Sequence, residues 1–449
     1  MSAITDRLNE WLFRRVSIAP LVVFRIAFGL MLLYGNYRTY AKGWIKELYI
    51  DPTFHFSFFT WMTPLEGNGM YVVFAILAVC SLGITFGFLY RISTFVFLVL
   101  FTYVELLDKT YYLNHYYLVS LLVFWLLCVP AHHWFSVDAK LFPKIRSTTC
   151  HHWHILIFKV QLSVVYFFAG LAKVNPDWLL RAQPMATWLP GKYQLPILGK
   201  FVHLKELAFL FSWAGCAYDL TIWIFLWIKK TRGLAYVAVL VFHILTGILF
   251  PRIGMFPIIM ITSTVIFFSS TFHERVLKLI GGGLPKQAQP DNYQVATPLR
   301  KSIISKLLVG YLLLHLFLPL RYLQFSGNLF WHEQGYRFSW RVMLMEKSGM
   351  TSFIVRDPVT NVQREADQNL YLTPFQKKQL RSEPDMMLQF GRFLGDRFKE
   401  ERGYAPEVYV KSRLSLNGRR SQVFTDEHYN IYTDQDPMRN GWIKPFKEK

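Results

Sequence analysis

The sequence predicts a polytopic α-helical membrane domain of about nine spans, followed by a soluble α+β domain. Hydrophobic residues make up 53% of the 449 residues and aromatic residues 17%, which is unusually apolar for a soluble protein. Apolar stretches long enough to cross a bilayer recur from residue 19 to residue 322. Beyond Pro319 the composition becomes polar. We therefore expect a membrane domain at residues 1–322 and a second domain at residues 323–449.

The predicted spans are apolar runs of roughly the 20 residues that a helix needs to cross the hydrocarbon layer. They cover residues 19–38, 70–89, 91–107, 115–131, 153–174, 206–228, 233–250, 254–271 and 303–322. The loop at residues 42–69 is rich in aromatic residues, and we expect it to lie along the membrane interface.

Charge placement gives the spans an orientation. Lysine and arginine are enriched in the cytoplasmic loops of membrane proteins, and here they fall in the N-terminal segment and in alternate loops. They are Arg7, Arg14 and Arg15; Arg91; Lys140, Lys144 and Arg146; Lys229, Lys230 and Arg232; and Arg275, Lys278, Lys286, Arg300 and Lys301. An odd number of spans then places residues 323–449 on the non-cytoplasmic side. This topology accounts for the net charge of +20 without a nucleic-acid partner, since no zinc-finger or RNA-binding motif is present.

The second domain shows short patterns of both kinds. Alternating residues at Arg337–Met345 predict a strand, and residues 373–402 have the apolar spacing of a helix. Residues 351–364 and 407–424 each predict a hairpin, the second with an Asn417-Gly418 turn. These patterns predict the α+β class.

Lys173 ends an apolar run that begins at Val160, and it is the first candidate for chemistry. An ammonium group moved toward hydrocarbon costs at least ~2.5 kcal/mol. Lys173 must therefore pair with an acid, reach the interface, or lose its proton and become a base.

Further polar groups lie at or inside the predicted spans. They are Asp108, Lys109, Asn114 and His115 at one boundary, and His243 within a later span. At the boundary, an ordinary ion pair between Asp108 and Lys109 is the simpler interpretation, and a functional site would require Lys173 to lie nearby. For His243, the simpler interpretation is a buried imidazole that bonds to a neighbouring backbone or hydroxyl group.

Several other functions are not supported. His132-His133 and His151-His152 with His154 lie in an inner basic loop without acidic ligands or an HExxH spacing, so no metal site is predicted. The four cysteines include no C-x-x-C pair, and we expect a disulfide-free protein. The sequence also lacks the G-x-S-x-G motif of serine hydrolases and the internal repeat common in transporters.

The chain resembles the vitamin K-dependent gamma-glutamyl carboxylases and their bacterial relatives, whose membrane part is called the HTTM domain. The resemblance covers nearly the whole chain and is carried by separate segments in the same order and at similar spacing. They are Leu107–Thr110 with Asn114-His115; His133–Asp138; Tyr166–Gly170 followed by Lys173 and Asp177-Trp178; Phe242-His243; Ile253–Phe256; and Gln334–Trp340.

This resemblance implies a cofactor site. Lys173 would be the catalytic base that takes a proton from vitamin K hydroquinone, which is phylloquinol or menaquinol. His115, with Asn114 beside it, would contact and stabilise the deprotonated cofactor, and Lys109 and His243 would complete the site. A dry, lipid-bounded chamber would keep the Lys173 amine neutral.

The resemblance also implies a substrate and a reaction. Tyr336, Ser339 and Trp340 fall where the family holds the glutamyl peptide of its protein substrate. The enzyme would carboxylate glutamate to gamma-carboxyglutamate, a carbon–carbon lyase reaction with oxygen and carbon dioxide as co-substrates, while reduced vitamin K becomes its epoxide. Oxygen chemistry at the quinone is needed because the γ-hydrogen of glutamate is too weakly acidic for any side-chain base. Capture of the peptide on a strand edge is one mode of binding.

The sequence departs from the animal members of this family. No cysteine lies between Ile50 and Pro64, so their disulfide is absent, and the chain ends at Lys449 without their C-terminal extension. Phe338 replaces a tyrosine expected before Ser339. These differences favour a bacterial member in an inner membrane, with the endoplasmic reticulum as the eukaryotic equivalent. The alternatives are a membrane quinone-binding protein or oxidoreductase without carboxylase activity, and a noncatalytic anchor.

Overall fold

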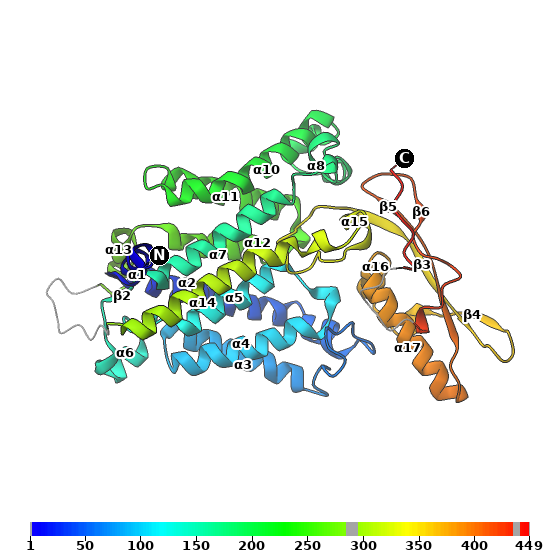
Figure 1. The fold of residues 1–449 in the computed structure, drawn as a ribbon, viewed down its shortest axis with the longest axis horizontal. Coiled ribbons are helices and arrows are strands. Elements are labelled where there is room, and N and C mark those ends of the chain that lie inside the picture. Colours follow the sequence, from blue (N-terminus) through cyan, green and yellow to red (C-terminus); the bar gives the residue numbers. More distant parts are fainter. Residues whose placement is uncertain (1, 284–294, 434–440, 449) are drawn as a thin grey trace.

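The computed structural model describes residues 2–283, 295–433 and 441–448. Long helices run side by side through most of the molecule, and a smaller part with a β-sheet lies at one end, which we call the outer end (Figure 1). The long helices are α2 (Ala19–Ala41), α3 (Gly69–Phe86), α4 (Tyr90–Leu107), α7 (His152–Leu171), α10 (Lys205–Trp227), α11 (Arg232–Leu249) and α14 (Pro298–Phe317). Within the described residues these seven are long and apolar enough to cross a membrane, α14 together with its continuation to Gln324. The helical membrane domain is therefore confirmed.

Two of the predicted spans, residues 115–131 and 254–271, are not among these seven helices. The elements concerned are α5 (Asn114–Cys128), α12 (Phe256–Thr264) and α13 (Ser270–Leu279). α5 is apolar but shorter, whereas the stretch at 254–271 is interrupted after Phe267, where the chain turns by 113° into α13. Ser269 begins the new helix because its side chain accepts a hydrogen bond from the backbone N–H of Phe272. The eighth predicted span is thus a broken helix.

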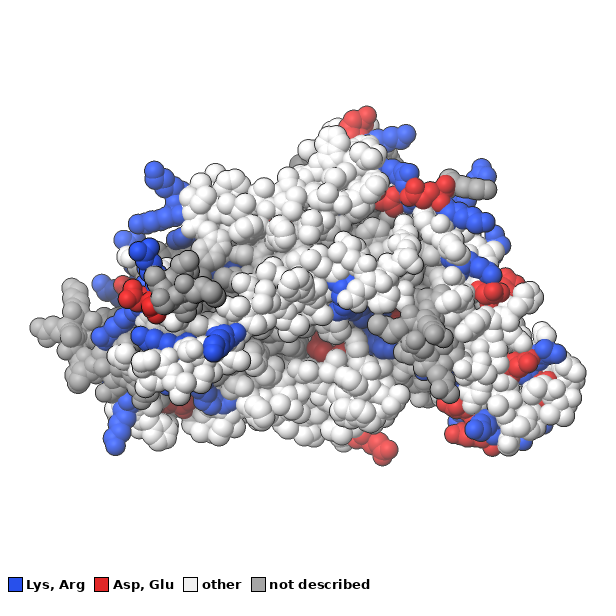
Figure 2. All heavy atoms as spheres, in the orientation of Figure 1, with Lys and Arg blue, Asp and Glu red and all other residues white. Residues whose placement is uncertain are grey.

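Basic residues gather at the end of the molecule opposite the outer end. This end carries α1 (Ser2–Phe13), the paired strands β1 (Arg15–Ser17) and β2 (Thr149–His151), and α6 (Val137–Leu141). On the visible face, lysine and arginine side chains outnumber acidic ones at this end, both kinds are frequent at the outer end, and few charges lie in the middle (Figure 2). This distribution is expected when the basic end faces the cytoplasm.

Cysteine labelling tests this orientation. In a Cys128→Ser background the remaining native cysteines are buried. We expect a membrane-impermeant maleimide to modify Val359→Cys in intact cells, because Val359 lies in the outer part and is 70% exposed. Lys144→Cys, exposed at the opposite end, should react only after lysis. The reverse pattern would invert the orientation.

The outer part is α+β, as predicted. Its elements are α15 (Leu329–His332), β3 (Lys347–Arg356), β4 (Gln363–Glu365), α16 (Pro374–Leu380), α17 (Pro384–Arg402), β5 (Glu407–Leu416) and β6 (Gln422–Val423). The antiparallel strands have the order β4-β3-β5-β6, which confirms both hairpins. Phe390 of α17 packs on Phe353 of β3, with ring centroids 5.0 Å apart. The helix predicted at 373–402 is two helices, since Pro384 begins a new one.

The strand predicted at Arg337–Met345 is wrong. Phe338, Trp340 and Met343 have positive φ angles of 59°, 60° and 53°. Residues in this left-handed region cannot continue a regular strand ladder. The segment is instead a loop between the membrane helices and the sheet, which we call the lid loop (residues 336–345).

The backbone at the edges of the two long strands is already hydrogen-bonded. On β3 the carbonyl groups of Thr351 and Phe353 accept hydrogen bonds from Gln368 and Ala366. On β5 the carbonyl of Ser412 accepts one from the backbone of Phe424. Peptide capture on a strand edge is therefore disfavoured at these positions.

The aromatic loop 42–69 contacts the outer domain. It includes a short helix at Lys46–Ile50. Further along, Gln376 of α16 donates a hydrogen bond to the backbone carbonyl of Phe54. Phe59 and Trp61 remain exposed, and their rings stack with centroids 5.8 Å apart.

Candidate functional site

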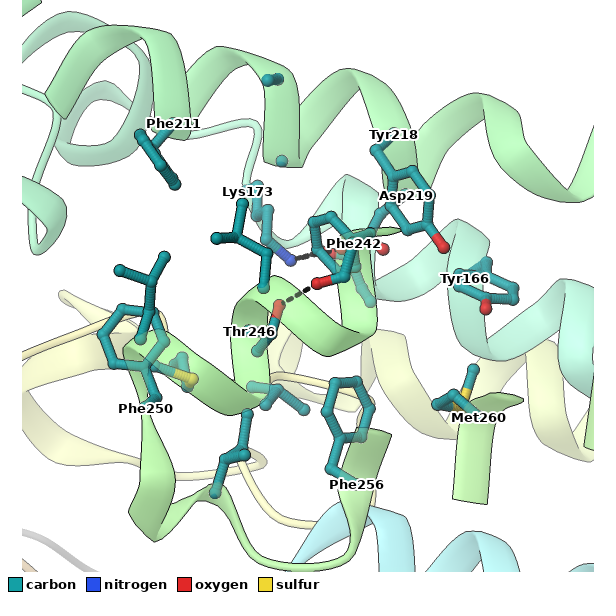
Figure 3. A pocket seen from close by; sticks show the side chains of 18 of the residues that line it. Tyr166, Lys173, Phe211, Tyr218, Asp219, Phe242, Thr246, Phe250, Phe256 and Met260 are labelled. Atoms are coloured by element: carbon teal, nitrogen blue, oxygen red, sulfur yellow. Dashed lines mark hydrogen bonds and ion pairs between the residues drawn. The ribbon is translucent and has the colours of Figure 1, made fainter. Parts of the chain in front are cut away.

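A cavity of about 490 Å³ lies among the membrane helices at the outer end. Its walls come from α5, α7, α10, α11 and α12, and Trp340, Val342 and Met343 of the lid loop also line it. Figure 3 shows Lys173 and Asp219 in the wall, with Phe242 and Phe256 among the aromatic side chains around the cavity. Most lining side chains are aliphatic or aromatic. The polar ones are Asn114, His115, Tyr166, Lys173, Tyr218, Asp219 and Thr246. The volume and the apolar lining are typical of a site for a small organic molecule.

Lys173 reaches this cavity from just beyond the end of α7, and it is not alone there. Its Nζ donates hydrogen bonds to Oδ2 of Asp219, 2.6 Å away, and to the carbonyl of Ala169, 3.1 Å away. The side chains of Lys173 and Asp219 are only 9% and 8% exposed. Of the three outcomes expected for Lys173, the structure shows pairing with an acid, because Asp219 of α10 lies beside it.

The Lys173–Asp219 contact depends on the close approach of α7 and α10. A Cβ atom on Gly170 would lie 2.6 Å from the backbone nitrogen of Leu220, so only glycine fits there. Asp219 was not among the residues predicted from the sequence, although an acidic residue well inside a predicted span is by itself a signal of function.

His115 lies at the first turn of α5 and also lines the cavity. It is 4% exposed, and its Nε2 is buried without a hydrogen-bond partner among the described residues. Buried polar atoms of this kind are rare unless a ligand or water completes them. The structure thus brings His115 and Lys173 to one cavity, which spacing along the sequence could not show.

Asn114 connects α5 to the lid loop. Its Nδ2 donates to the carbonyl of Arg341 at 2.6 Å, and its Oδ1 accepts from the Tyr112 hydroxyl at 2.9 Å. The same hydroxyl accepts a hydrogen bond from the backbone N–H of Phe338. Asn114 therefore lines the cavity and also fixes the loop that covers it.

Trp340 is the predicted substrate residue that reaches the cavity. Its ring stacks on Tyr117 of α5 at 5.1 Å, and its Nε1 is buried without a partner among the described residues. Tyr336 and Ser339 are not in the cavity wall, and the Ser339 hydroxyl donates to the Tyr336 carbonyl. These two residues shape the turn that presents Trp340. Positive φ angles in such a loop store strain, a common feature of ligand-binding segments.

His243 lies behind the wall of the cavity. It is completely buried in α11, and its Nε2 is 3.2 Å from the hydroxyl of Tyr166, which does line the cavity. The ring also packs on Phe256 at 5.1 Å. His243 is therefore placed to orient Tyr166, and it does not face the cavity directly.

Lys109 lies outside the cavity and pairs with the outer domain, not with Asp108. Its Nζ is 3.3 Å from Oδ2 of Asp385, which also binds Arg337 at 2.6 Å. Burial acts to raise the pKa of Asp385, but Arg337 and Lys109 outweigh it and lower the pKa to about 2. Asp108 instead accepts hydrogen bonds from Thr110 and Gln376. These contacts fasten α16 and α17 to the membrane domain.

A second ionic contact joins the domains near α8 (Pro176–Leu180). Asp177 accepts hydrogen bonds from Arg419 and Asn417 of the β5–β6 turn, at 2.8 Å and 2.7 Å from its Oδ2. Burial acts to raise the pKa of Asp177, but these hydrogen bonds outweigh it and hold the pKa below its usual value. The pair therefore stabilises the docked outer domain.

Replacing Asp177 by asparagine is expected to lower the free energy of unfolding by about 1.5–3 kcal/mol at pH 7, because Arg419 loses a charged partner. The depressed pKa means that the wild-type contribution is present above about pH 3.9 and is lost as the pH falls through the folded-state value. Thermal unfolding in detergent should therefore show a difference that shrinks in acid. Asp396→Asn, an exposed site, is the control, and an equal effect there would contradict the assignment.

Comparison with protein families identifies this arrangement. The family model described as HTTM domain matches residues 13–272, more than half of the chain. The model described as vitamin K-dependent gamma-carboxylase, lumenal domain, matches residues 300–449. The chain belongs to the vitamin K-dependent gamma-carboxylase family. No solved structure matches the chain.

Membership of the vitamin K-dependent gamma-carboxylase family agrees with the architecture. It implies a vitamin K cofactor, and it places the C-terminal domain on the non-cytosolic side of a membrane. The lumenal-domain match begins within α14, so it includes the last membrane helix. No group of three metal-binding side chains is found in the part of the chain that the structure describes, and all four cysteines, which lie in that part, are free thiols.

Proposed function

We propose that the protein carboxylates glutamyl side chains of a protein or peptide to gamma-carboxyglutamate, with reduced vitamin K, oxygen and carbon dioxide as co-substrates. The observation that carries this proposal is the shared cavity, in which Lys173 and His115 face a space covered by Trp340 of the outer domain. Residues 1–322 would form the chamber, and residues 323–449 would hold the substrate at its mouth.

The cavity suits a naphthoquinol. Its size is within the range of small-molecule sites, and its walls are largely apolar. The unpartnered His115 Nε2 and Trp340 Nε1 are available to bond oxygen atoms of such a ligand. The predicted cofactor residue Asn114 also lines this space.

The ligand can arrive from the lipid. Leu210 and Ala214 of α10 and Val241 and Leu245 of α11 line the cavity and are exposed to solvent in the isolated protein. A lipid-soluble cofactor would enter between these two helices. In a bacterium the membrane would be the inner membrane.

When bound, reduced vitamin K supplies with oxygen the strong base that glutamate deprotonation requires. Lys173 would accept the proton of a cofactor hydroxyl, and His115 would bond the oxygen from which it leaves. The apolar walls would keep water from quenching the reaction. The lid loop would bring the glutamyl side chain to the open side of the chamber.

A single assay separates the candidate functions. The purified protein in lipid is incubated with reduced phylloquinone or menaquinone, labelled bicarbonate and a glutamate-rich peptide, and peptide label and epoxide are measured together. We expect both products, and neither when the quinol is omitted. Epoxide without labelled peptide would favour the membrane quinone oxidoreductase. Absence of both products would overturn the proposal in favour of a noncatalytic anchor.

A further inference from the structure

We propose that Asp219 is a positioning residue that holds Lys173 in the cavity and stabilises the ammonium group formed when Lys173 accepts a proton. This inference rests on the proposed function, because it gives Lys173 the role of base. It adds a residue to the site that the sequence patterns did not indicate.

The geometry singles out this pair. The Lys173 Nζ is 2.6 Å from Asp219 Oδ2, within a cavity whose other titratable lining groups are His115, Tyr166 and Tyr218. None of these three is an anion at neutral pH. Asp219 is therefore the acidic side chain in the cavity wall that can balance the charge of Lys173.

The surroundings keep the two groups together. The ring of Trp178 lies 5.4 Å from the Lys173 Nζ, and the Cys216 thiol contacts the Gly170 carbonyl one helical turn before Asp219. Gly170 allows the backbones of α7 and α10 to touch at this level. The pair is thus held in place by the close packing of these two helices.

The proton balance explains the role of the carboxylate. Lys173 would take the proton of a cofactor hydroxyl, so that an N–H bond forms on Lys173 while the electron pair of the broken O–H bond stays on oxygen. The new ammonium group would be unstable in an apolar cavity without a counter-charge. Asp219 supplies that charge at 2.6 Å, so it strengthens Lys173 as a base.

The test compares Asp219→Asn with Asp219→Glu. Without the carboxylate, Lys173 should remain unprotonated to lower pH, so the acid limb of the kcat profile should move down by about 1 to 3 pH units. The maximal kcat should fall at least tenfold, because the base is weaker, while KM for the quinol changes little. In Asp219→Glu, the acid limb of the kcat profile should stay at the same pH as in the wild type. Thr221→Val, on the exposed side of α10, is the control and should leave the activity unchanged.

A second readout needs no cofactor. An apolar aryl fluoride reacts only with a neutral amine, and peptide mapping reports the modification of Lys173 at each pH. We expect modification of Asp219→Asn to begin at lower pH than in the wild type and in Asp219→Glu. The proposal is overturned if Asp219→Asn shifts neither the acid limb of the kcat profile nor the pH at which Lys173 is modified. If Asp219→Asn does not fold, a shift of about one pH unit or more in Asp219→Glu would also overturn it.

The two readouts also separate this inference from the proposed function. If the wild-type protein shows no carboxylation, but the labelling of Lys173 depends on Asp219 as expected, the role of the pair is supported and the proposed reaction is rejected. If the wild-type protein carboxylates, but Asp219→Asn changes neither the kcat profile nor the labelling of Lys173, the proposed reaction is supported and the role of Asp219 is rejected.

Discussion

Replacing Lys173 by methionine is expected to lower the carboxylation rate by about 10²- to 10⁴-fold, the usual contribution of a positioned base. Methionine has nearly the length of lysine and suits the apolar wall, so the variant should fold even though Asp219 loses its partner. The measurement is incorporation of labelled carbon dioxide into a glutamate peptide, with epoxide formation followed in parallel. Both products should decrease together, because the base acts before either is formed.

Lys205→Met is the matched control for this change. Lys205 begins α10 and is exposed at the outer end, so its loss removes a lysine from the same region without touching the cavity. We expect wild-type rates. Full activity of Lys173→Met in a buffer without added amines would show that another group is the base.

Replacing His115 by phenylalanine is expected to lower kcat by about 10²- to 10³-fold, as for the removal of one group that stabilises a developing anion. The ring volume is kept, and the packing against Tyr116 and Phe256 should survive. The lost group is Nε2, which has no protein partner among the described residues and so leaves no broken hydrogen bond. Steady-state kinetics with varied quinol give kcat and KM separately.

His203→Phe, exposed before α10, controls for the loss of a histidine from the outer end. It should leave both constants unchanged. A rise in KM of His115→Phe with an unchanged kcat would mean that His115 only binds the cofactor. An unchanged kcat/KM would remove His115 from the site.

The sequence predicts the membrane helices well because their signal is local. A run of apolar residues determines a span wherever it occurs, and each of the expected stretches contains a helix. The break near Ser269 is harder to predict, because the apolar run continues to Phe268 and the capping serine that begins α13 is a short signal at its end. The strand predicted for the lid loop is wrong for a related reason. Its alternation is real, but Trp340 is buried against Tyr117 of the membrane domain and not on a sheet.

The site was only partly predictable for the same reason. Lys173 was recognisable from its unusual position, yet its partner lies on another helix, and only the packing of Gly170 against Leu220 brings them together. His243 and Lys109 were expected in the site by resemblance. His243 instead lies behind the cavity wall and Lys109 contacts the outer domain, so neither side chain lines the cavity. Residue type and order along the chain do not distinguish these positions.

The lid loop has a consequence for how the protein can be divided. Trp340, Val342 and Met343 belong to the outer domain, yet they line a cavity built mainly by helices of the membrane domain. A truncated protein ending near Gln324 would retain the candidate membrane-spanning helices of the described residues, but it would lack these three side chains of the cavity wall. The two domains differ in composition, but residues of both line the cavity, so neither domain alone contains the complete candidate site.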